Sequence, residues 1–183
     1  AYDTLGILID GPYVSYEDDK ATAQYIYMQN GAKIVITEEL KKSKSSPITL
    51  RVPTDLEGIQ FTAKLKSKHN QENAESNTKA RLFIVSDIEA NFKALRTILQ
   101  ANNIIDEKLQ WKFGDGRLIL TGDFFDRGQQ LTEVLWLIYS LEEQAKQAKG
   151  YVHFVLGNHE IMNLNGDLRY VPRKYHDHAR SSR

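Results

Sequence analysis

Residues 122–128 read Gly-Asp-Phe-Phe-Asp-Arg-Gly and come just after the apolar run 118–120. Two further strings have the same setting: Asp-Ile-Glu at 87–89 follows the apolar run 82–85, and Gly-Asn-His-Glu at 157–160 follows the run 152–156. Short apolar runs that lead into loop-like or helical sequence predict the strands of an α/β fold. Ligands in such folds bind in the crevice beyond the carboxyl ends of the strands. We therefore expect the three strings to meet at one site.

The three strings carry metal ligands that are rich in oxygen. Their Asp, Glu, Asn and His side chains suit Mn, Fe or Zn better than a soft metal. A two-metal hydrolytic site needs a ligand that bridges cations about 3.5–4 Å apart, and Asp123 is the expected bridge because it lies between the other strings. Asp87 and Glu89 stand two residues apart, so they can point the same way toward a first metal. Asn158 offers a neutral carbonyl oxygen to the second metal, which keeps the negative charge low enough for a phosphate to approach, and we expect it to contribute to substrate binding as well.

Three other side chains of these strings suit the transfer of a phosphoryl group. A histidine close to a carboxylate is held in one tautomer and is favoured as imidazolium, so His159 beside Asp126 could protonate a leaving alkoxide. Arg127 presents a planar fork that matches phosphate oxygens. The ligands and these groups together predict phosphoester hydrolysis, in which hydroxide generated at the metals attacks phosphorus.

The strings at 122–128 and 157–160 resemble the signature of the calcineurin-like metallophosphoesterases, in the phosphoprotein phosphatase branch. The run Ile-Met-Asn-Leu-Asn-Gly-Asp-Leu-Arg-Tyr at 161–170 looks like the bacterial, Shewanella-like phosphatase subgroup. The resemblance covers about residues 81–175. It implies a metallophosphoesterase-type sheet sandwich flanked by helices, and it implies a site made of metal ligands, an acid dyad and phosphate-binding arginines. The residues implied are Asp87, Asp123 and Asn158 for metal, Asp126 and His159 for the dyad, and Arg127 and Arg169 for phosphate.

The chain departs from the family pattern in two places. Most of the family has Asp-x-His-Gly where residues 87–90 read Asp-Ile-Glu-Ala, so Glu89 as a ligand is an inference from its chemistry. An anionic oxygen in place of a nitrogen favours harder ions, and Mn is the expected metal. The family also supplies two downstream histidines to the second metal. We read His176 and His178 as polar residues of a tail, and we expect the chain to be part of a longer polypeptide that completes the sandwich and the second metal site.

The organisation along the chain changes between residues 66 and 79. Residues 1–65 read as a β-rich accessory subdomain, in which Asn30-Gly31 between two β-branched and aromatic runs predicts a hairpin. The polar stretch 66–79 reads as a flexible linker. Residues 80–183 read as the first part of the catalytic domain. It should have amphipathic helices at about 91–100 and 131–148, and a hairpin from Trp111 to Leu120 around Gly-Asp-Gly.

Composition restricts the partners and leaves the compartment open. The chain has 183 residues, with 24 Lys and Arg against 24 Asp and Glu, and it has no cysteine. A balanced charge without Lys/Arg runs among aromatics predicts no nucleic-acid surface. No stretch is long and apolar enough for a membrane span, so we expect a soluble protein, either cytoplasmic or exported to the periplasm.

Three functions fit these observations. The first is metal-dependent hydrolysis of a phosphomonoester, in a phosphoprotein or a small phosphate ester. The second keeps the site but acts on a dinucleoside polyphosphate or another pyrophosphate. The third is a non-catalytic binding module with a degenerate metal site. Phosphorylated protein or a small phosphoester is the partner that the first function predicts.

Overall fold

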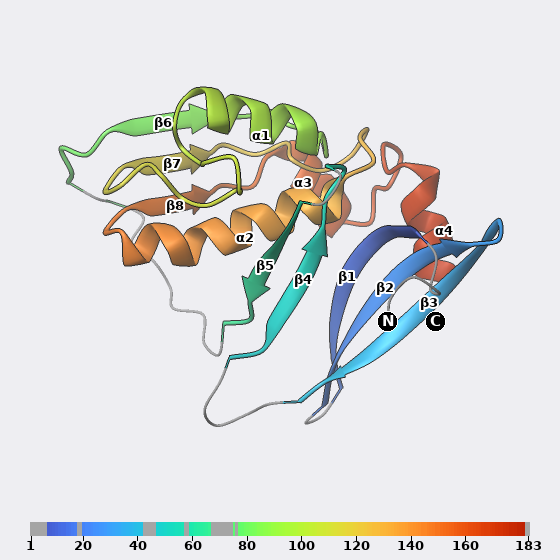
Figure 1. Cartoon of the computed structure of the whole chain (residues 1–183). Coiled ribbons are helices and arrows are strands. Elements are labelled where there is room, and N and C mark those ends of the chain that lie inside the picture. The colour runs from blue at the N-terminus through green and yellow to red at the C-terminus, as the bar shows by residue number, and fades with distance from the viewer. Residues whose placement is uncertain are drawn as a thin grey trace.

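Three separate sheets and four helices make up the computed structural model of the chain (Figure 1), which describes residues 7–17, 20–41, 47–56, 59–66, 75 and 77–181. The predicted linker at 66–79 lies mostly outside the described residues. No helix in the described part of the chain combines the length and the apolar character that crossing a membrane requires.

The first sheet is antiparallel and holds β1 (Ile7–Glu17), β2 (Lys20–Gln29) and β3 (Ala32–Leu40) in that order. Asn30 and Gly31 connect β2 to β3 with φ values of 50° and 78°. Positive φ at both central residues is what a tight hairpin turn requires, and Asn-Gly supplies it at low cost. The predicted hairpin is therefore confirmed, with Gln29 opposite Ala32.

The third sheet is parallel and positions the candidate site. It has the order β6 (Leu82–Val85), β7 (Arg117–Leu120) and β8 (Tyr151–Phe154). The helices α1 (Phe92–Ala101) and α2 (Leu131–Gln147) follow the loops after β6 and β7, close to the predicted ranges. Side chains such as Leu118 and Leu120 point to the helices and are fully buried. Alternate residues on the other face are exposed, with Leu82 at 55% and Ile84 at 60%.

The predicted hairpin from Trp111 to Leu120 is wrong. β7 lies in the middle of its sheet and pairs with β6 on one side and β8 on the other, so neither edge is free for residues 111–113. Trp111 instead forms an isolated bridge with Ile105, and its indole N–H donates to the carbonyl of Gly114 at 2.9 Å. Pairing between sequence-distant strands overrides the local turn signal.

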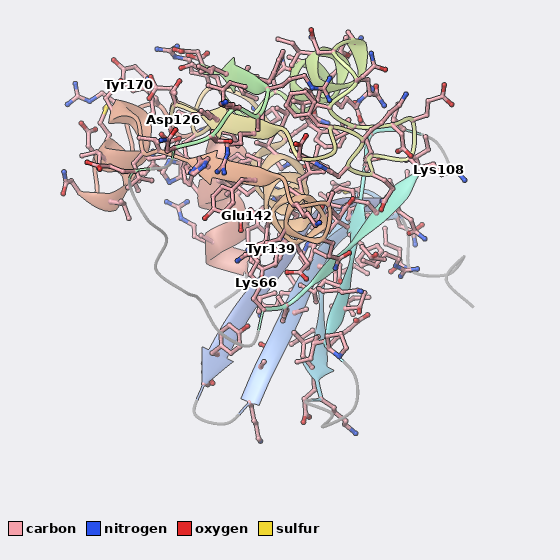
Figure 2. All side chains as sticks on the ribbon, turned by 90° about the vertical axis from the view of Figure 1, so that its left-hand side faces the viewer. Lys66, Lys108, Asp126, Tyr139, Glu142 and Tyr170 are labelled. Atoms are coloured by element: carbon pink, nitrogen blue, oxygen red, sulfur yellow. The ribbon has the colours of Figure 1, made fainter. Side chains whose placement is uncertain are left out.

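The second sheet is the hairpin of β4 (Thr49–Pro53) and β5 (Gln60–Lys64), and it packs on the helices of the α/β unit. The rings of Phe61 on β5 and Phe92 on α1 stack with centroids 6.5 Å apart. Just after β5, the backbone N–H of Lys66 donates to the Tyr139 hydroxyl on α2 at 2.7 Å, and the Lys66 ammonium pairs with Glu142 (Figure 2). The division of the chain into an accessory and a catalytic part stays a prediction, but this hairpin shares its core with the α/β unit.

Trp136 of α2 packs against the apolar clusters of both parts. Its indole N–H donates to the carbonyl of Pro12 on β1 at 2.8 Å. The helices α3 (Asn158–Leu164) and α4 (Arg173–Ser181) complete the fold, and α4 lies beside the first sheet (Figure 1). The prediction that His178 belongs to a polar tail is wrong, because its side chain is 2% exposed inside this contact.

Candidate active site

The loops that carry the three predicted strings meet at the carboxyl ends of β6, β7 and β8. The backbone N–H of Asp87 donates to the carbonyl of Gly122 at 3.2 Å, and that of Glu89 donates to the carbonyl of Asp123 at 3.0 Å. The third loop joins them because the backbone N–H of His159 donates to Oδ1 of Asp123 at 3.0 Å. The loop after the central strand therefore contacts both of its neighbours.

Two glycines permit this close contact. A Cβ on Gly157 would lie 2.3 Å from Oδ1 of Asp123, and a Cβ on Gly122 would lie 2.3 Å from Cα of Gly157. Gly122 also has a φ of 95°, which side chains rarely adopt. A larger residue at either position would push the two loops apart and move Asp123.

The site loops are also strained in their backbone. Six of the ten described non-glycine residues with positive φ lie in them, namely Asp87, Glu89, Ala90, Asp123, Asp126 and Arg127. Such conformations cost of the order of 1 kcal/mol or more each and persist only where the surrounding contacts fix them, and they concentrate at functional sites. The strain therefore agrees with the sequence-based location of the site.

Glu160 supplies many of these fixing contacts, and sequence reasoning assigned it no role. The residue is 2% exposed, and its carboxylate accepts four backbone N–H groups at 2.8–3.0 Å, from Gly157, Asp123, Phe124 and Phe125. A signal was present in the sequence, because Glu three residues after a helix N-cap commonly reaches back to the N-cap amide. Here the same carboxylate reaches across to the loop after β7 as well.

Asp126 and His159 form a buried pair. Oδ2 of Asp126 lies 2.7 Å from Nδ1 of His159, and the two residues are 3% and 4% exposed. The side chain of Asn163, one turn further along α3, donates to the other carboxylate oxygen of Asp126 at 2.9 Å and to the carbonyl of His159 at 3.0 Å. The contact with Asp126 leaves Nε2 of His159 facing the Arg127 guanidinium, at 3.4 Å.

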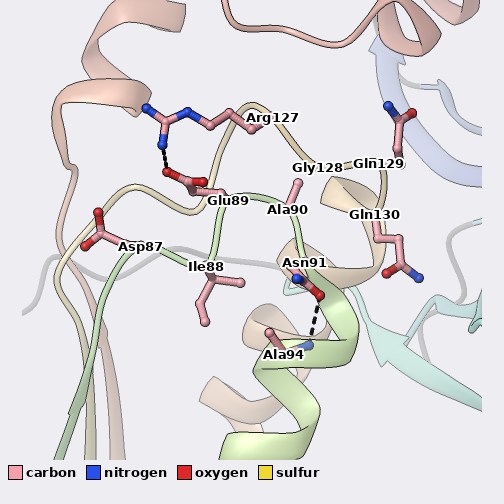
Figure 3. A pocket seen from close by; sticks show the side chains of 10 residues that line it. All are labelled: Asp87, Ile88, Glu89, Ala90, Asn91, Ala94, Arg127, Gly128, Gln129 and Gln130. Atoms are coloured by element: carbon pink, nitrogen blue, oxygen red, sulfur yellow. Dashed lines mark hydrogen bonds and ion pairs between the residues drawn. The ribbon is translucent and has the colours of Figure 1, made fainter.

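Arg127 has contacts on three sides. Its guanidinium pairs with Glu89 (Figure 3), its Cζ lies 5.7 Å from the ring centre of Tyr170, and its backbone N–H donates to the Tyr170 carbonyl at 3.1 Å. The side chain is 53% exposed, so it can reach a ligand in solution. Asp126 and Tyr170 lie near one another at this end of the sheet (Figure 2). Tyr170 was named only as part of a family-like run, and the structure places its ring 5.3 Å from that of His159.

The remaining predicted site residues are exposed or face other groups. Arg169 is exposed and pairs with Asp167 at 2.9 Å. Its hydrogen bond to that carboxylate, supported by the charge, keeps the pKa of Asp167 below its usual value. Asn158 is exposed at the first position of α3. Asp87 is also exposed, and its carboxylate accepts a hydrogen bond from the hydroxyl of Ser86.

The donor chemistry at this edge fits a metal site only in part. Asp87, Asp123 and Asn158 present oxygen atoms from three adjoining loops, and Asp123 is held at the centre by its neighbours. Glu89 points to Arg127 instead of joining them, so its role as a ligand stays a prediction (Figure 3). In the part of the chain that the structure describes, no three His, Cys, Asp or Glu side chains are arranged to hold a metal ion.

A pocket of about 540 Å³ opens beside the Glu89–Arg127 pair (Figure 3). Its lining runs from Asp87 and the start of α1 to the amide side chains of Gln129 and Gln130. The pocket gives a substrate room next to the guanidinium.

The sequence that carries this site is similar to a known protein family and to two named phosphatases. Residues 80–182 match the family described as calcineurin-like phosphoesterase. Shewanella-like protein phosphatase 2 of Arabidopsis thaliana is 28% identical over 139 residues, which are 76% of this chain and 36% of that protein. Shewanella-like protein phosphatase 1 of Plasmodium berghei is 28% identical over 111 residues, which are 61% of this chain and 31% of that protein.

The fold as a whole is also found in solved structures. A cold-active protein tyrosine phosphatase of a psychrophilic Shewanella species matches with a TM-score of 0.68 and 34% identity, over 94% of this chain and 50% of that chain. A second structure of a cold-active protein tyrosine phosphatase matches with a TM-score of 0.69 and 34% identity, over 94% and 48% of the two chains. The chain thus spans about half the length of these structures and about a third of the curated relatives.

Proposed function

The chain belongs to the calcineurin-like phosphoesterase family, and we propose that the protein is a metal-dependent phosphomonoesterase that acts on phosphoprotein or on a small phosphate ester. The observation that carries the proposal is the buried pair of Asp126 and His159, placed beside Arg127 at the ends of three parallel strands. A general acid and a phosphate-binding cation within hydrogen-bonding reach of one another are the two protein groups that phosphoester cleavage needs.

Arg127 binds the phosphoryl oxygens. Its guanidinium is exposed next to the pocket and has Glu89 as its anionic partner, so an incoming phosphate competes with that carboxylate. The guanidinium is a planar fork with several donors, and it suits the phosphate. The phosphate has two or more negatively charged oxygens, so it binds the guanidinium more strongly than the single carboxylate does. The ring of Tyr170 lies beside the guanidinium, with its centre 5.7 Å from Cζ.

His159 gives a proton from Nε2 to the leaving oxygen. Asp126 accepts the hydrogen bond from Nδ1, so it fixes the orientation of the ring and the tautomer. Asn163 holds the second oxygen of Asp126, which keeps the carboxylate from rotating. The nitrogen that would carry the proton therefore faces the site, beside the phosphate-binding arginine.

We assign Asp87, Asp123 and Asn158 to the metal ions, and Mn is the expected ion. Asp123 belongs to the central one of the three loops. When bound, such ions supply a nucleophilic hydroxide near neutral pH and neutralise charge on the phosphoryl group. The hydrogen bond that Asp123 accepts from the His159 amide, and the lack of room for a Cβ between Asp123 and Gly157, support its central place.

A comparison of substrates tests the proposal in the full-length polypeptide. An aryl phosphate and a phosphotyrosine peptide should be hydrolysed, whereas a diadenosine polyphosphate should be hydrolysed at least about a hundredfold more slowly, since the site holds one phosphoryl group against one guanidinium. Preference for the polyphosphate would move the substrate to the pyrophosphate class. Binding of orthophosphate without hydrolysis of any of the three would favour a binding module.

A further inference from the structure

A buried carboxylate on the first sheet lies at the junction with the α/β unit. Asp10 of β1 is 1% exposed. It contacts five groups from three parts of the chain, namely the Gly11 amide at 2.9 Å, the Tyr13 hydroxyl at 2.9 Å, Nζ of Lys174 at 3.1 Å, Nδ1 of His178 at 2.7 Å and the hydroxyl of Thr132. Burial by itself raises the pKa of Asp10, but these hydrogen bonds and the charge of Lys174 outweigh it and hold the pKa below its usual value. The carboxyl is therefore ionised and ties β1 to α2 and α4.

Lys174 links Asp10 to the loop that holds the candidate site. Its ammonium group pairs with Asp10 and also donates to the backbone carbonyl of Gln129 at 2.6 Å. Gln129 is two residues after Arg127. The next residue on α4, Tyr175, accepts the backbone N–H of Leu131 at 2.7 Å through its hydroxyl. Helix α4 thus holds the backbone at Gln129, just after the phosphate-binding arginine, and at Leu131, where α2 begins.

We propose that Lys174, anchored by Asp10 on the first sheet, is a positioning residue that fixes residues 127–131 and so orients Arg127 for phosphoryl binding. The proposal rests on the function of Arg127 proposed above. It gives the first sheet a part in phosphate affinity, because the carboxylate that orients Lys174 belongs to that sheet. The neighbouring Arg173 differs from Lys174, since its side chain is 92% exposed and pairs with Asp177 on the same helix at 3.7 Å.

Two matched variants separate positioning from a general loss of charge. Lys174→Met keeps the aliphatic stem and removes the ammonium, and Arg173→Met removes a neighbouring charge that has no contact with the loop. Amide hydrogen exchange of residues 127–131 should be faster in Lys174→Met and unchanged in Arg173→Met. The KM for an aryl phosphate and the dissociation constant for orthophosphate should both rise about tenfold in Lys174→Met, with kcat within about twofold of wild type. The reason is that the substitution weakens binding of the ground state and of the transition state equally and leaves the chemical step unchanged.

Two results would overturn the proposal. One is unchanged exchange at residues 127–131 in Lys174→Met, and the other is faster exchange with unchanged affinity for orthophosphate. If Lys174→Met does not fold, Tyr175→Phe removes only the acceptor of the Leu131 amide and should show faster exchange there with a smaller rise in KM. Exchange and orthophosphate binding require no turnover, so they decide the proposal even if the protein hydrolyses no phosphate ester.

Discussion

Oε2 of Glu160 lies 2.8 Å from the backbone nitrogen of Asp123, so a residue in the first turn of α3 fixes the loop that follows β7. The same oxygen accepts the Gly157 amide at 2.8 Å, and the other oxygen accepts the amides of Phe124 and Phe125. One buried carboxylate thereby sets the distance between the central loop and the loop after β8.

Glu160→Gln should destabilise the protein by about 3 kcal/mol, because the new NH₂ group would face backbone N–H groups and cannot accept hydrogen bonds from them. Chemical denaturation of both proteins measures this loss. Glu107→Gln, at an exposed glutamate outside the site, is the control and should lie within about 0.5 kcal/mol of wild type. Equal stability of the Glu160→Gln and Glu107→Gln proteins would show that the four hydrogen bonds are not important.

Asn163→Ala should lower kcat on the order of tenfold for alkyl phosphates, and much less for aryl phosphates with acidic leaving groups. Loss of the hydrogen bond to Asp126 loosens the pair with His159, and only a basic leaving oxygen needs a well-placed acid. Steady-state kinetics with both substrate types measure the difference. Asn165→Ala, at an exposed position at the end of the same helix, is the control. An equal loss for both substrates would mean that Asn163 acts on the fold and not on the acid.

Gly157→Ala should reduce the metal content and lower turnover by about a hundredfold or more, because the added Cβ would collide with Asp123. Elemental analysis and an aryl phosphate assay check both effects. Gly166→Ala is a stringent control: its Cβ has open space, but its φ of 79° makes the substitution strained, so it should cost about 1 kcal/mol of stability and leave the metal content intact. Normal metal content in the Gly157→Ala protein would contradict the place given to Asp123.

The stability of the folded chain should fall as the pH rises from about 4.5 to about 7, through the contribution of Glu133 on α2. Burial raises the pKa of this carboxyl to about 7, and its Oε2 has no hydrogen-bond partner among the described residues. The folded protein therefore binds the proton more tightly than the unfolded chain, and up to about 3 kcal/mol is lost across this window.

Glu133→Gln removes that titration, so its stability relative to wild type should increase between pH 5 and pH 8. Denaturation of the two proteins across this range measures the difference, in which the other titrating groups cancel. Glu143→Gln on the same helix, whose carboxylate accepts the Gln147 side chain at 3.2 Å, is the control and should run parallel to wild type. Parallel curves for wild type and Glu133→Gln would remove Glu133 as the cause.

The parts of the fold that follow from local sequence were predictable. Each strand of the parallel sheet is a short apolar run with a polar string after it, and α1 and α2 show their buried faces in their spacing. The meeting of the three loops followed for the same reason, because parallel strands bring their carboxyl ends to one edge. The Asn30-Gly31 turn needs only its own two residues, and it too was predictable.

Contacts between distant residues could not be predicted in the same way. Asp10 and His178 are 168 positions apart, so no pattern in either segment indicates that they pair. Glu160 had a local signal for its bond to Gly157 but none for its bonds to the loop after β7. The false hairpin at Trp111 has the opposite origin, since its local signal was clear and the pairing of β7 with its two neighbours excluded it.

Hydrolysis of an aryl phosphate by the full-length polypeptide, before and after chelation, tests the central claim that Asp123 is at the centre of a metal-dependent phosphatase site. We predict that a chelator abolishes activity, that Mn²⁺ restores it, and that Asp123→Asn loses at least about a hundredfold with or without Mn²⁺. Full activity after chelation, or a wild-type rate in Asp123→Asn, would contradict the account.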